Sequence, residues 1–122
     1  GPVAYTYKFL SNHSHNDIRE AYLSYKDKNE RACAATHNYT VDGSSFLYVG
    51  KVKSDFWGRV IQHFGFNSNK DTSSIQLFHW AKAIGLKVEI SAYEFIPEMD
   101  TLISDVELKL AQNIHPIIGK HK

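Results

Sequence analysis

Cysteine, long apolar runs and a signal sequence are scarce or missing in this chain of 122 residues. Cys33 is the single cysteine, so the chain cannot form an internal disulfide and does not depend on oxidising conditions. No apolar run approaches the roughly 20 residues that a membrane-spanning helix needs. Residues 1–5 lack the basic region and the apolar core of a signal peptide. We therefore expect no membrane partner and a cytoplasmic location, or a secreted one if the chain is a toxin fragment.

An excess of charge of one sign is missing too. The 14 lysines and arginines nearly balance the 13 aspartates and glutamates, which gives a formal net charge of +1 with the histidines neutral. A protein that binds nucleic acid through its overall charge would be much more basic. Any favourable field must come from local clusters. Lys51, Lys53 and Arg59 form one such cluster in the sequence, and residues 120–122 form another.

What is present is the composition of one ordinary globular domain, with 43% hydrophobic residues. Hydrophobic periodicity and capping residues predict an α+β domain. We expect strands at residues 5–10, 31–38, 45–52 and 87–95, and helices at about 16–25, 54–64, 72–84 and 97–113. A turn at residues 41–44, signalled by Asp-Gly, should join the second and third strands into a hairpin. The expected fold is a small, mainly antiparallel three-stranded sheet flanked by helices, with an N-terminal strand–helix extension.

Residue types suited to phosphodiester cleavage occur in the second half of this pattern. Arg59 and His63 are one helical turn apart and share a helix face. Glu107 lies beside apolar residues of the last helix, where a carboxylate is costly unless it is paired or binds a metal. Phosphodiester cleavage uses a hard cation, a guanidinium on the phosphate and a general base. These residue types are common, so alone they do not single out a nuclease.

Order and spacing add a family resemblance. Tyr48-Val49-Gly50-Lys51, with Lys53 two residues later, is similar to the second signature of the GIY-YIG nuclease superfamily. Arg59 follows Tyr48 by eleven residues, and with His63 it resembles the helix that carries the family's arginine and histidine.

The resemblance extends to the end of the chain. Residues 72–74 resemble the serine-rich start of the family's second helix. Glu107 falls where the family places its metal-binding glutamate, and Pro116 follows nine residues later. The match covers residues 33–116, so we expect a nuclease domain at 31–122. Residues 1–30 are then an extension packed on that domain, which either helps to choose the substrate or covers one edge of the sheet.

The resemblance implies an endonuclease that hydrolyses DNA, with duplex DNA as the expected partner. Glu107 would hold one Mg²⁺ or Mn²⁺, and Arg59 would bind the phosphate. The implied catalytic residues are Tyr48, Arg59, His63 and Glu107, with His37 or Tyr39 as further candidates, and the implied substrate-binding residues are Lys51, Lys53, Ser73 and Ser74.

The chain departs from the family pattern in two places. The first signature should lie on the first strand of the hairpin, about eleven residues before Tyr48, and His37 stands where the family has a tyrosine. Tyr39 should point to the same sheet face as His37. Either residue, or Tyr48, could be the general base, and a histidine is intrinsically the better base at neutral pH. In addition, no asparagine follows Pro116, as it does in many family members.

Two other interpretations remain open from the sequence. The chain could be a non-catalytic module that keeps the fold and binds nucleic acid or protein. It could also be the nuclease end of a larger toxin or restriction enzyme, which the scar-like start at residues 1–2 permits. Trp57, Phe78 and Trp80 are expected in the core rather than as platforms for stacking bases, and His63 is as compatible with a structural role as with a catalytic one.

Overall fold

The computed structural model describes residues 1–37 and 44–121. In chain order the elements are β1 (Val3–Phe9), α1 (His15–Asp27), β2 (Phe46–Val52), α2 (Phe56–Phe64), α3 (Leu77–Trp80), the 3₁₀ helix η1 (Lys82–Ile84), β3 (Val88–Glu94), the 3₁₀ helix η2 (Pro97–Thr101) and α4 (Ile103–Ile114). Tyr39 and most of the turn predicted at residues 41–44 lie outside the described residues.

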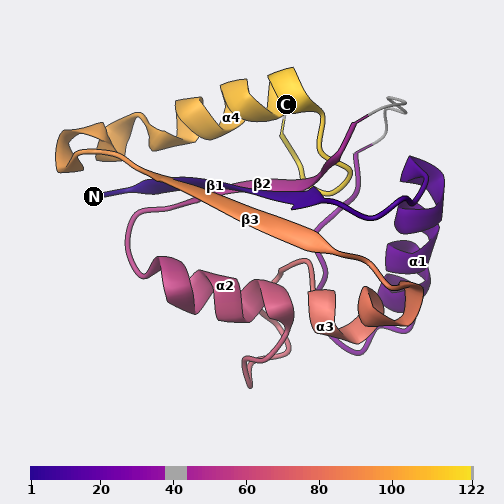
Figure 1. Cartoon of the computed structure of the whole chain (residues 1–122). Coiled ribbons are helices and arrows are strands. Elements are labelled where there is room, and N and C mark those ends of the chain that lie inside the picture. Colours follow the sequence, from indigo (N-terminus) through magenta and orange to yellow (C-terminus); the bar gives the residue numbers. More distant parts are fainter. Residues whose placement is uncertain (38–43, 122) are drawn as a thin grey trace.

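The three strands form one antiparallel sheet in the order β2-β1-β3 (Figure 1). This confirms the predicted α+β class with a three-stranded sheet flanked by helices. β1 is the central strand: Tyr7 pairs with Tyr48 of β2 and with Ile90 of β3. It is therefore not a cover at one edge of the sheet, which was one of the roles considered for residues 1–30.

The prediction of a strand at residues 31–38 is wrong for residues 31–37, the part of this range that the structure describes. Within residues 31–37, only Cys33 and Thr36 make isolated bridges, to Ser74 and Ile118 respectively. β1 takes the place beside β2 that the predicted hairpin gave to this segment. Its side chains are buried on both faces along most of its length, which suits a central strand, whereas residues 31–36 are only partly buried.

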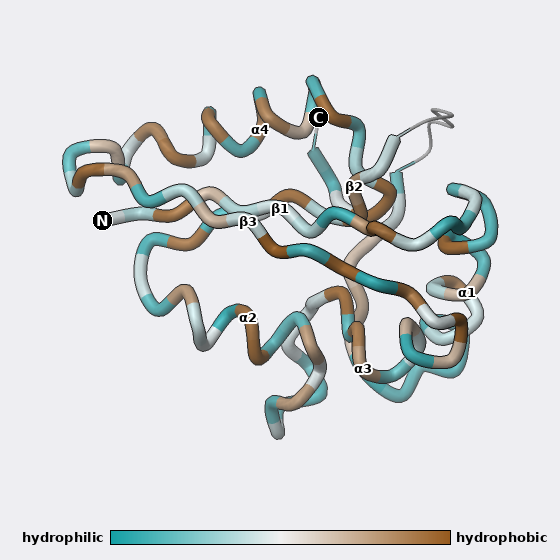
Figure 2. The backbone as a smooth tube through the Cα atoms, viewed as in Figure 1, coloured by the Kyte–Doolittle hydropathy of each residue, from teal (hydrophilic) through white to brown (hydrophobic). Residues whose placement is uncertain are grey.

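The helices form a layer on each side of the sheet. α2 and α3 lie on one side, α4 lies on the other, and α1 packs beside α3 at one end (Figure 1). Hydrophobic and hydrophilic positions alternate along α4 and β3, as expected for elements with one buried side (Figure 2). None of the described helices is long and apolar enough to cross a membrane.

The helix predicted at residues 72–84 is interrupted. It consists of the single turn α3 followed by η1, and residues 72–76 approach it in a non-helical conformation. The cause is local: Ser74 bridges to Cys33, and Gln76 has a positive φ of 50° immediately before α3. The last predicted helix starts at Pro97 as expected, but as the 3₁₀ helix η2 before α4 begins.

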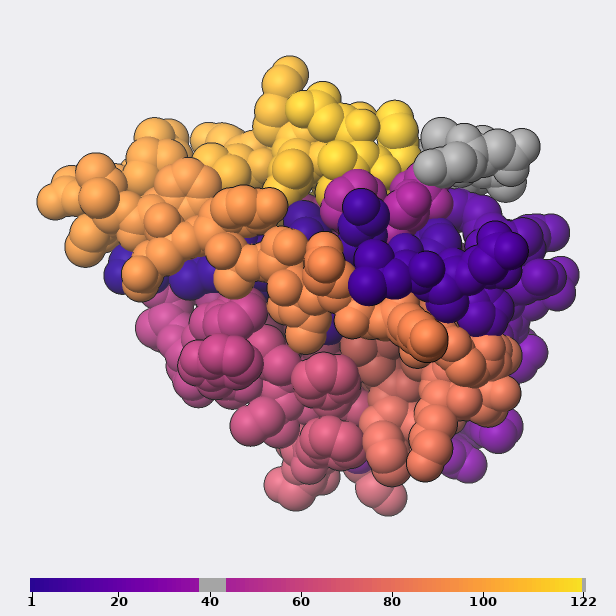
Figure 3. Space-filling model, viewed as in Figure 1, coloured from indigo at the N-terminus to yellow at the C-terminus, as the bar shows by residue number. Residues whose placement is uncertain are grey.

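The core lies mainly between the sheet and the α1–α3 side. Tyr5, Tyr7 and Trp80 belong to it, with 1%, 0% and 4% of their surface exposed. The expectation that Trp57 and Phe78 are core residues is wrong, because they are 73% and 54% exposed. Trp57 lies on the solvent-exposed side of α2, and Phe78 lies on that of α3. β3 also reaches the surface, between α4 and α2 in the space-filling view (Figure 3).

Candidate functional site

Arg59 is fixed in place by the local structure of α2. Asp55 caps this helix, and its Oδ1 accepts a hydrogen bond of 3.1 Å from the Gly58 amide. One turn later, Arg59 Nη1 donates to Gln62 Oε1 at 2.7 Å and to the Ser73 carbonyl at 3.2 Å. The guanidinium is thereby held against the segment before α3. A guanidinium has five N–H donors, so these two bonds leave others for a ligand.

Beside Arg59 lies a group of rings that we call the tyrosine cluster: Tyr5, Tyr7, Tyr48 and His63. The ring centroids of Tyr48 and His63 are 4.7 Å apart, and those of Tyr5 and Tyr7 are 5.9 Å apart. Strand pairing creates the cluster, because Tyr7 lies opposite Tyr48 and Tyr5 lies opposite Gly50 on the same sheet face. Gly50 leaves the space that the ring of Tyr5 fills.

His63 supports this cluster from behind. The Ile75 amide donates to His63 Nδ1 at 3.4 Å, so the proton of the neutral ring is on Nε2, which lies 2.8 Å from Tyr5 Oη. Complete burial, assisted by the charge of Arg59, lowers the pKa of His63 well below its usual value. His63 is thus a neutral group without access to the surface. It can position Tyr5, but the direct catalytic role predicted for it does not fit this burial.

The phenols of the cluster sit in an environment that disfavours the phenolate. Burial raises the pKa values of Tyr5, Tyr7 and Tyr48, and the positive charge of Arg59 opposes this rise in all three. Tyr7 Oη is buried and has no hydrogen-bond partner among the described residues. A buried unsatisfied hydroxyl is unusual and costly, and such groups often mark functional sites.

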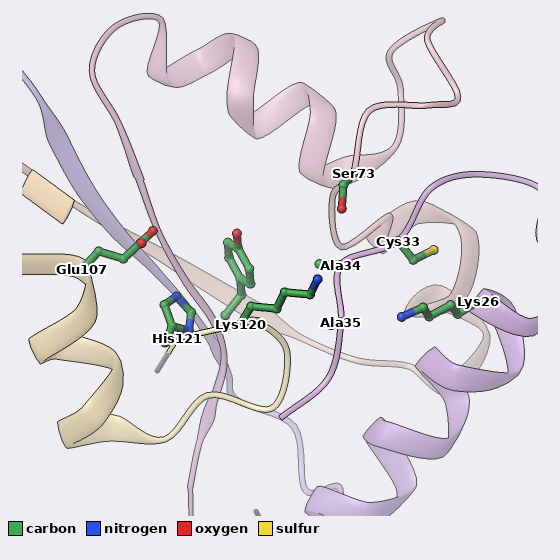
Figure 4. A pocket seen from close by; sticks show the side chains of 10 residues that line it. Lys26, Cys33, Ala34, Ala35, Ser73, Glu107, Lys120 and His121 are labelled. Atoms are coloured by element: carbon green, nitrogen blue, oxygen red, sulfur yellow. The ribbon is translucent and has the colours of Figure 1, made fainter. Parts of the chain in front are cut away.

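A cavity of about 420 Å³ opens in front of Tyr48. At one end it is lined by Tyr48, Glu107 and His121, and it continues past Ser73 toward α1 (Figure 4). Figure 4 shows Glu107 reaching in from α4 and His121 from the C-terminal segment. The sequence separates these residues widely, and the sheet edge at β2 brings them together.

Glu107 is a half-buried carboxylate at this cavity. Burial raises its pKa, and the positive charges of Lys51 and Arg59 act in the opposite direction. Its own negative charge contributes in turn to the raised pKa of Tyr48. Between residues of the described ranges, no hydrogen bond or salt bridge reaches the Glu107 carboxylate. Tyr48, Arg59 and Glu107 are therefore close enough to influence one another electrostatically.

His37 lies behind His121 and not at the cavity. His121 Nε2 donates to the Val49 carbonyl at 3.0 Å, so its neutral Nδ1 accepts a hydrogen bond of 3.1 Å from His37 Nε2. His37 is 8% exposed, and burial with the nearby His121 and His115 lowers its pKa to about 4. The structure does not bring His37, one of the predicted bases, to the cavity, because its ring is buried and hydrogen-bonded to His121.

The predicted substrate-binding residues divide. Lys51 is half-buried, and its positive charge lowers the pKa of Glu107. Lys53 is exposed after β2, and Ser73 lines the cavity. Ser74 does not line the cavity: it is 1% exposed, and its hydroxyl donates to the Gln62 carbonyl at 2.7 Å. Tyr39 lies outside the described residues.

Several residues at the site were not anticipated. Tyr5 and Tyr7 were missed because β1 was assigned to an extension, although a short strand that is apolar on both faces signals a central position. Lys120 and His121 reach the cavity because Ile118 bridges in parallel to Tyr48. No local pattern in the sequence predicts the bridge between Ile118 and Tyr48.

The residues present fit a hard cation held through one carboxylate. No group of three or more histidine, cysteine, aspartate or glutamate side chains suited to a metal occurs in the described part of the chain. Mg²⁺ is commonly bound by only one or two carboxylates and completes its shell with water and substrate phosphate. Glu107 is half-buried at a cavity and has no hydrogen bond from another described residue, which matches that donor set.

Comparisons with protein-family models, with curated proteins and with solved structures find no match to this chain.

Proposed function

We propose that this chain is an endonuclease that hydrolyses phosphodiester bonds with one divalent cation, in the manner its resemblance to the GIY-YIG superfamily implies. The observation that carries the proposal is the convergence of Tyr48 and Glu107 on one cavity, with Arg59 near enough to affect the pKa values of both. A carboxylate and a hydroxyl at one cavity, with a guanidinium close to both, are the groups that phosphodiester hydrolysis requires.

In this proposal Arg59 binds the phosphate being cut. Its hydrogen bonds to Gln62 and Ser73 fix the guanidinium before substrate arrives, so little reorganisation accompanies binding. Its planar fork can bind two phosphate oxygens at once, which a lysine cannot do.

Glu107 is proposed to hold Mg²⁺ or Mn²⁺. When bound, the cation would neutralise charge on the phosphate and on the leaving oxygen. Lys51 assists Glu107 by keeping its carboxylate ionised, since the lysine charge lowers the pKa that burial raises.

Tyr48 is the proposed partner of the attacking water, because its side chain lines the cavity, whereas that of His37 does not. The third candidate, Tyr39, lies outside the described residues. Its raised pKa keeps the hydroxyl protonated at rest, so it first orients the water by hydrogen bonding. The phenolate that would take up the water proton forms only after the phenol has released its own proton to solvent, and the positive charge of Arg59 favours that release. Tyr7, opposite Tyr48 on the strand that pairs with β2, is proposed to take the first-signature position earlier assigned to His37.

The direct test is incubation of the purified chain with supercoiled plasmid and with a single-stranded RNA, in Mg²⁺, Mn²⁺ or EDTA. We expect nicked and linear plasmid in Mg²⁺ and Mn²⁺ and intact plasmid in EDTA, because the cation on Glu107 is required. Intact plasmid and RNA under all conditions, with salt-dependent binding of DNA, would contradict hydrolysis and favour the non-catalytic binding module.

Tyr7→Phe separates stability from activity. Removing a buried hydroxyl without a described partner should raise the free energy of unfolding by about 1 kcal/mol. If Tyr7 acts beside Tyr48, the same change should slow plasmid nicking by about ten-fold or more. Urea unfolding and the nicking rate measure the two effects.

Tyr22→Phe is the matched comparison. Tyr22 Oη donates to the Ala34 carbonyl at 2.6 Å. Loss of this hydroxyl should therefore lower the free energy of unfolding by about 1 kcal/mol, whereas Tyr7→Phe should raise it. A Tyr7→Phe protein that nicks DNA at the parent rate would remove Tyr7 from the active site.

A further inference from the structure

The cavity has a second end, away from Glu107, that the proposed cleavage reaction does not use. Lys26 from α1 and Lys120 from the C-terminal segment both line it. Figure 4 shows the two side chains pointing toward each other from either side of the Ala34–Ala35 segment. We call this part of the cavity the lysine end.

The lysine end carries positive charge that the described residues do not neutralise. Within the described ranges, no acidic side chain forms a salt bridge with Lys26 or Lys120. Among the described residues that line the cavity, Glu107 is the only carboxylate, and it belongs to the other end. Two lysines that converge on a cavity without an acidic partner form a site for an anion.

The position and size of the lysine end restrict the anion. It continues the cavity that contains Tyr48, so its ligand can be joined to a group bound there. The volume of about 420 Å³ is in the range of pockets that hold small molecules, which leaves room for about one nucleotide of a strand. The wall at this end comes from α1 and residues 33–35, both of which follow β1 and precede β2 in the chain.

We propose that Lys26 and Lys120 together bind the phosphate next to the one being cut, on the same nucleic-acid strand. This deepens the proposed function and rests on it for the identity of the first phosphate. The first phosphate would then be held by Arg59, beside the end of the cavity that Tyr48 and Glu107 line, and the second by the lysines at the other end. Such a clamp fixes the direction in which the strand runs through the site.

Binding can be measured without cleavage. Fluorescein-labelled dT12 is titrated with the Glu107→Gln protein, in Mg²⁺, over a series of NaCl concentrations, by fluorescence anisotropy. Adding Lys26→Gln and Lys120→Gln together should weaken binding about ten-fold at low salt. It should also reduce the slope of log K against log salt by about 0.7, the value for one phosphate contact on a single strand.

The control removes the same charge elsewhere. Lys28 and Lys82 are exposed, and neither lines the cavity, so Lys28→Gln with Lys82→Gln should leave both the affinity and the slope close to those of the parent. Lys26→Arg should retain binding because it keeps the charge. Circular dichroism of each variant confirms that it is folded.

The outcomes separate this inference from the proposed nuclease activity. If the double variant at Lys26 and Lys120 binds dT12 with the parent's affinity and slope, or no worse than the control, the lysine end is not a phosphate site. If binding responds as expected but the chain with Glu107 intact nicks no plasmid, the nuclease proposal fails while the phosphate site stands.

Discussion

Glu107→Gln is expected to reduce the rate of plasmid nicking in Mg²⁺ by at least about 100-fold. The amide keeps the shape of the side chain but loses the negative charge that would hold the cation. Because burial already raises the pKa of Glu107, the ionised group is poorly solvated, and its neutral replacement should leave stability unchanged or slightly higher. Loss of activity in a fully stable protein therefore points to cation binding and not to unfolding.

Asp105→Asn is the control on the same helix. Asp105 is an exposed residue of α4 that does not line the cavity, so this variant should nick plasmid at the parent rate. Arg59→Lys is the companion test, since it keeps the positive charge and removes the planar fork. It should lower the rate by about 100-fold, the size of the loss when one donor to the transition state is removed. Parent-like rates in both Glu107→Gln and Arg59→Lys would rule out the roles proposed for these residues.

Gly50→Ala is expected to destabilise the fold by about 1–3 kcal/mol, the usual range for overpacking a core. A Cβ at this position would overlap the Tyr5 ring and lie 2.7 Å from its Cε2 atom. The ring cannot easily move away, because the centroids of Phe56 and His63 lie 5.6 Å from its own and Tyr5 Oη is bonded to His63. Displaced, it would also disturb the tyrosine cluster, so we expect nicking to fall as well.

Thermal unfolding checks this prediction, with an expected decrease in Tm of about 5–15 °C. Tyr5→Leu shortens the side chain that causes the overlap. Gly50→Ala should therefore lower the free energy of unfolding clearly less in a Tyr5→Leu background than in the parent. The double-mutant cycle measures the coupling between the two positions. A single Gly50→Ala protein with the parent's Tm would show that the ring and the glycine are not in conflict.

The elements that were predicted well are those specified by local sequence. Asp55 caps α2 within one residue of the predicted start at 54, and Gly85, in the left-handed region, ends the α3–η1 segment directly after the predicted limit at 84. β2 and β3 follow from their β-forming composition and alternation. The central position of β1 is different, because it depends on pairing between segments far apart in the chain. Hydrophobic periodicity predicts that a segment forms a strand, but it does not predict which strands pair with that segment.

The same distinction explains the candidate site. Tyr48, Arg59 and Glu107 could be named because their order and spacing resemble a family pattern. His37 was misplaced because the spacing was counted along a hairpin that the described residues do not form. Lys26 was not named, and Lys120 and His121 were noted only as part of a basic C-terminal cluster, because their approach to the cavity depends on how α1 and the C-terminal segment pack around the β2 edge.

The place of β1 also governs how the chain can assemble. Val3–Phe9 leaves the ribosome before the strands that flank it, so Tyr7 must wait for Tyr48, and Val3 must wait for Glu94, before the two ladders can close. No early hairpin can seed this sheet from its centre, and native topologies dominated by such distant pairings fold slowly. During synthesis the nascent β1 therefore presents two unpaired edges, which makes it the segment most in need of protection from other chains.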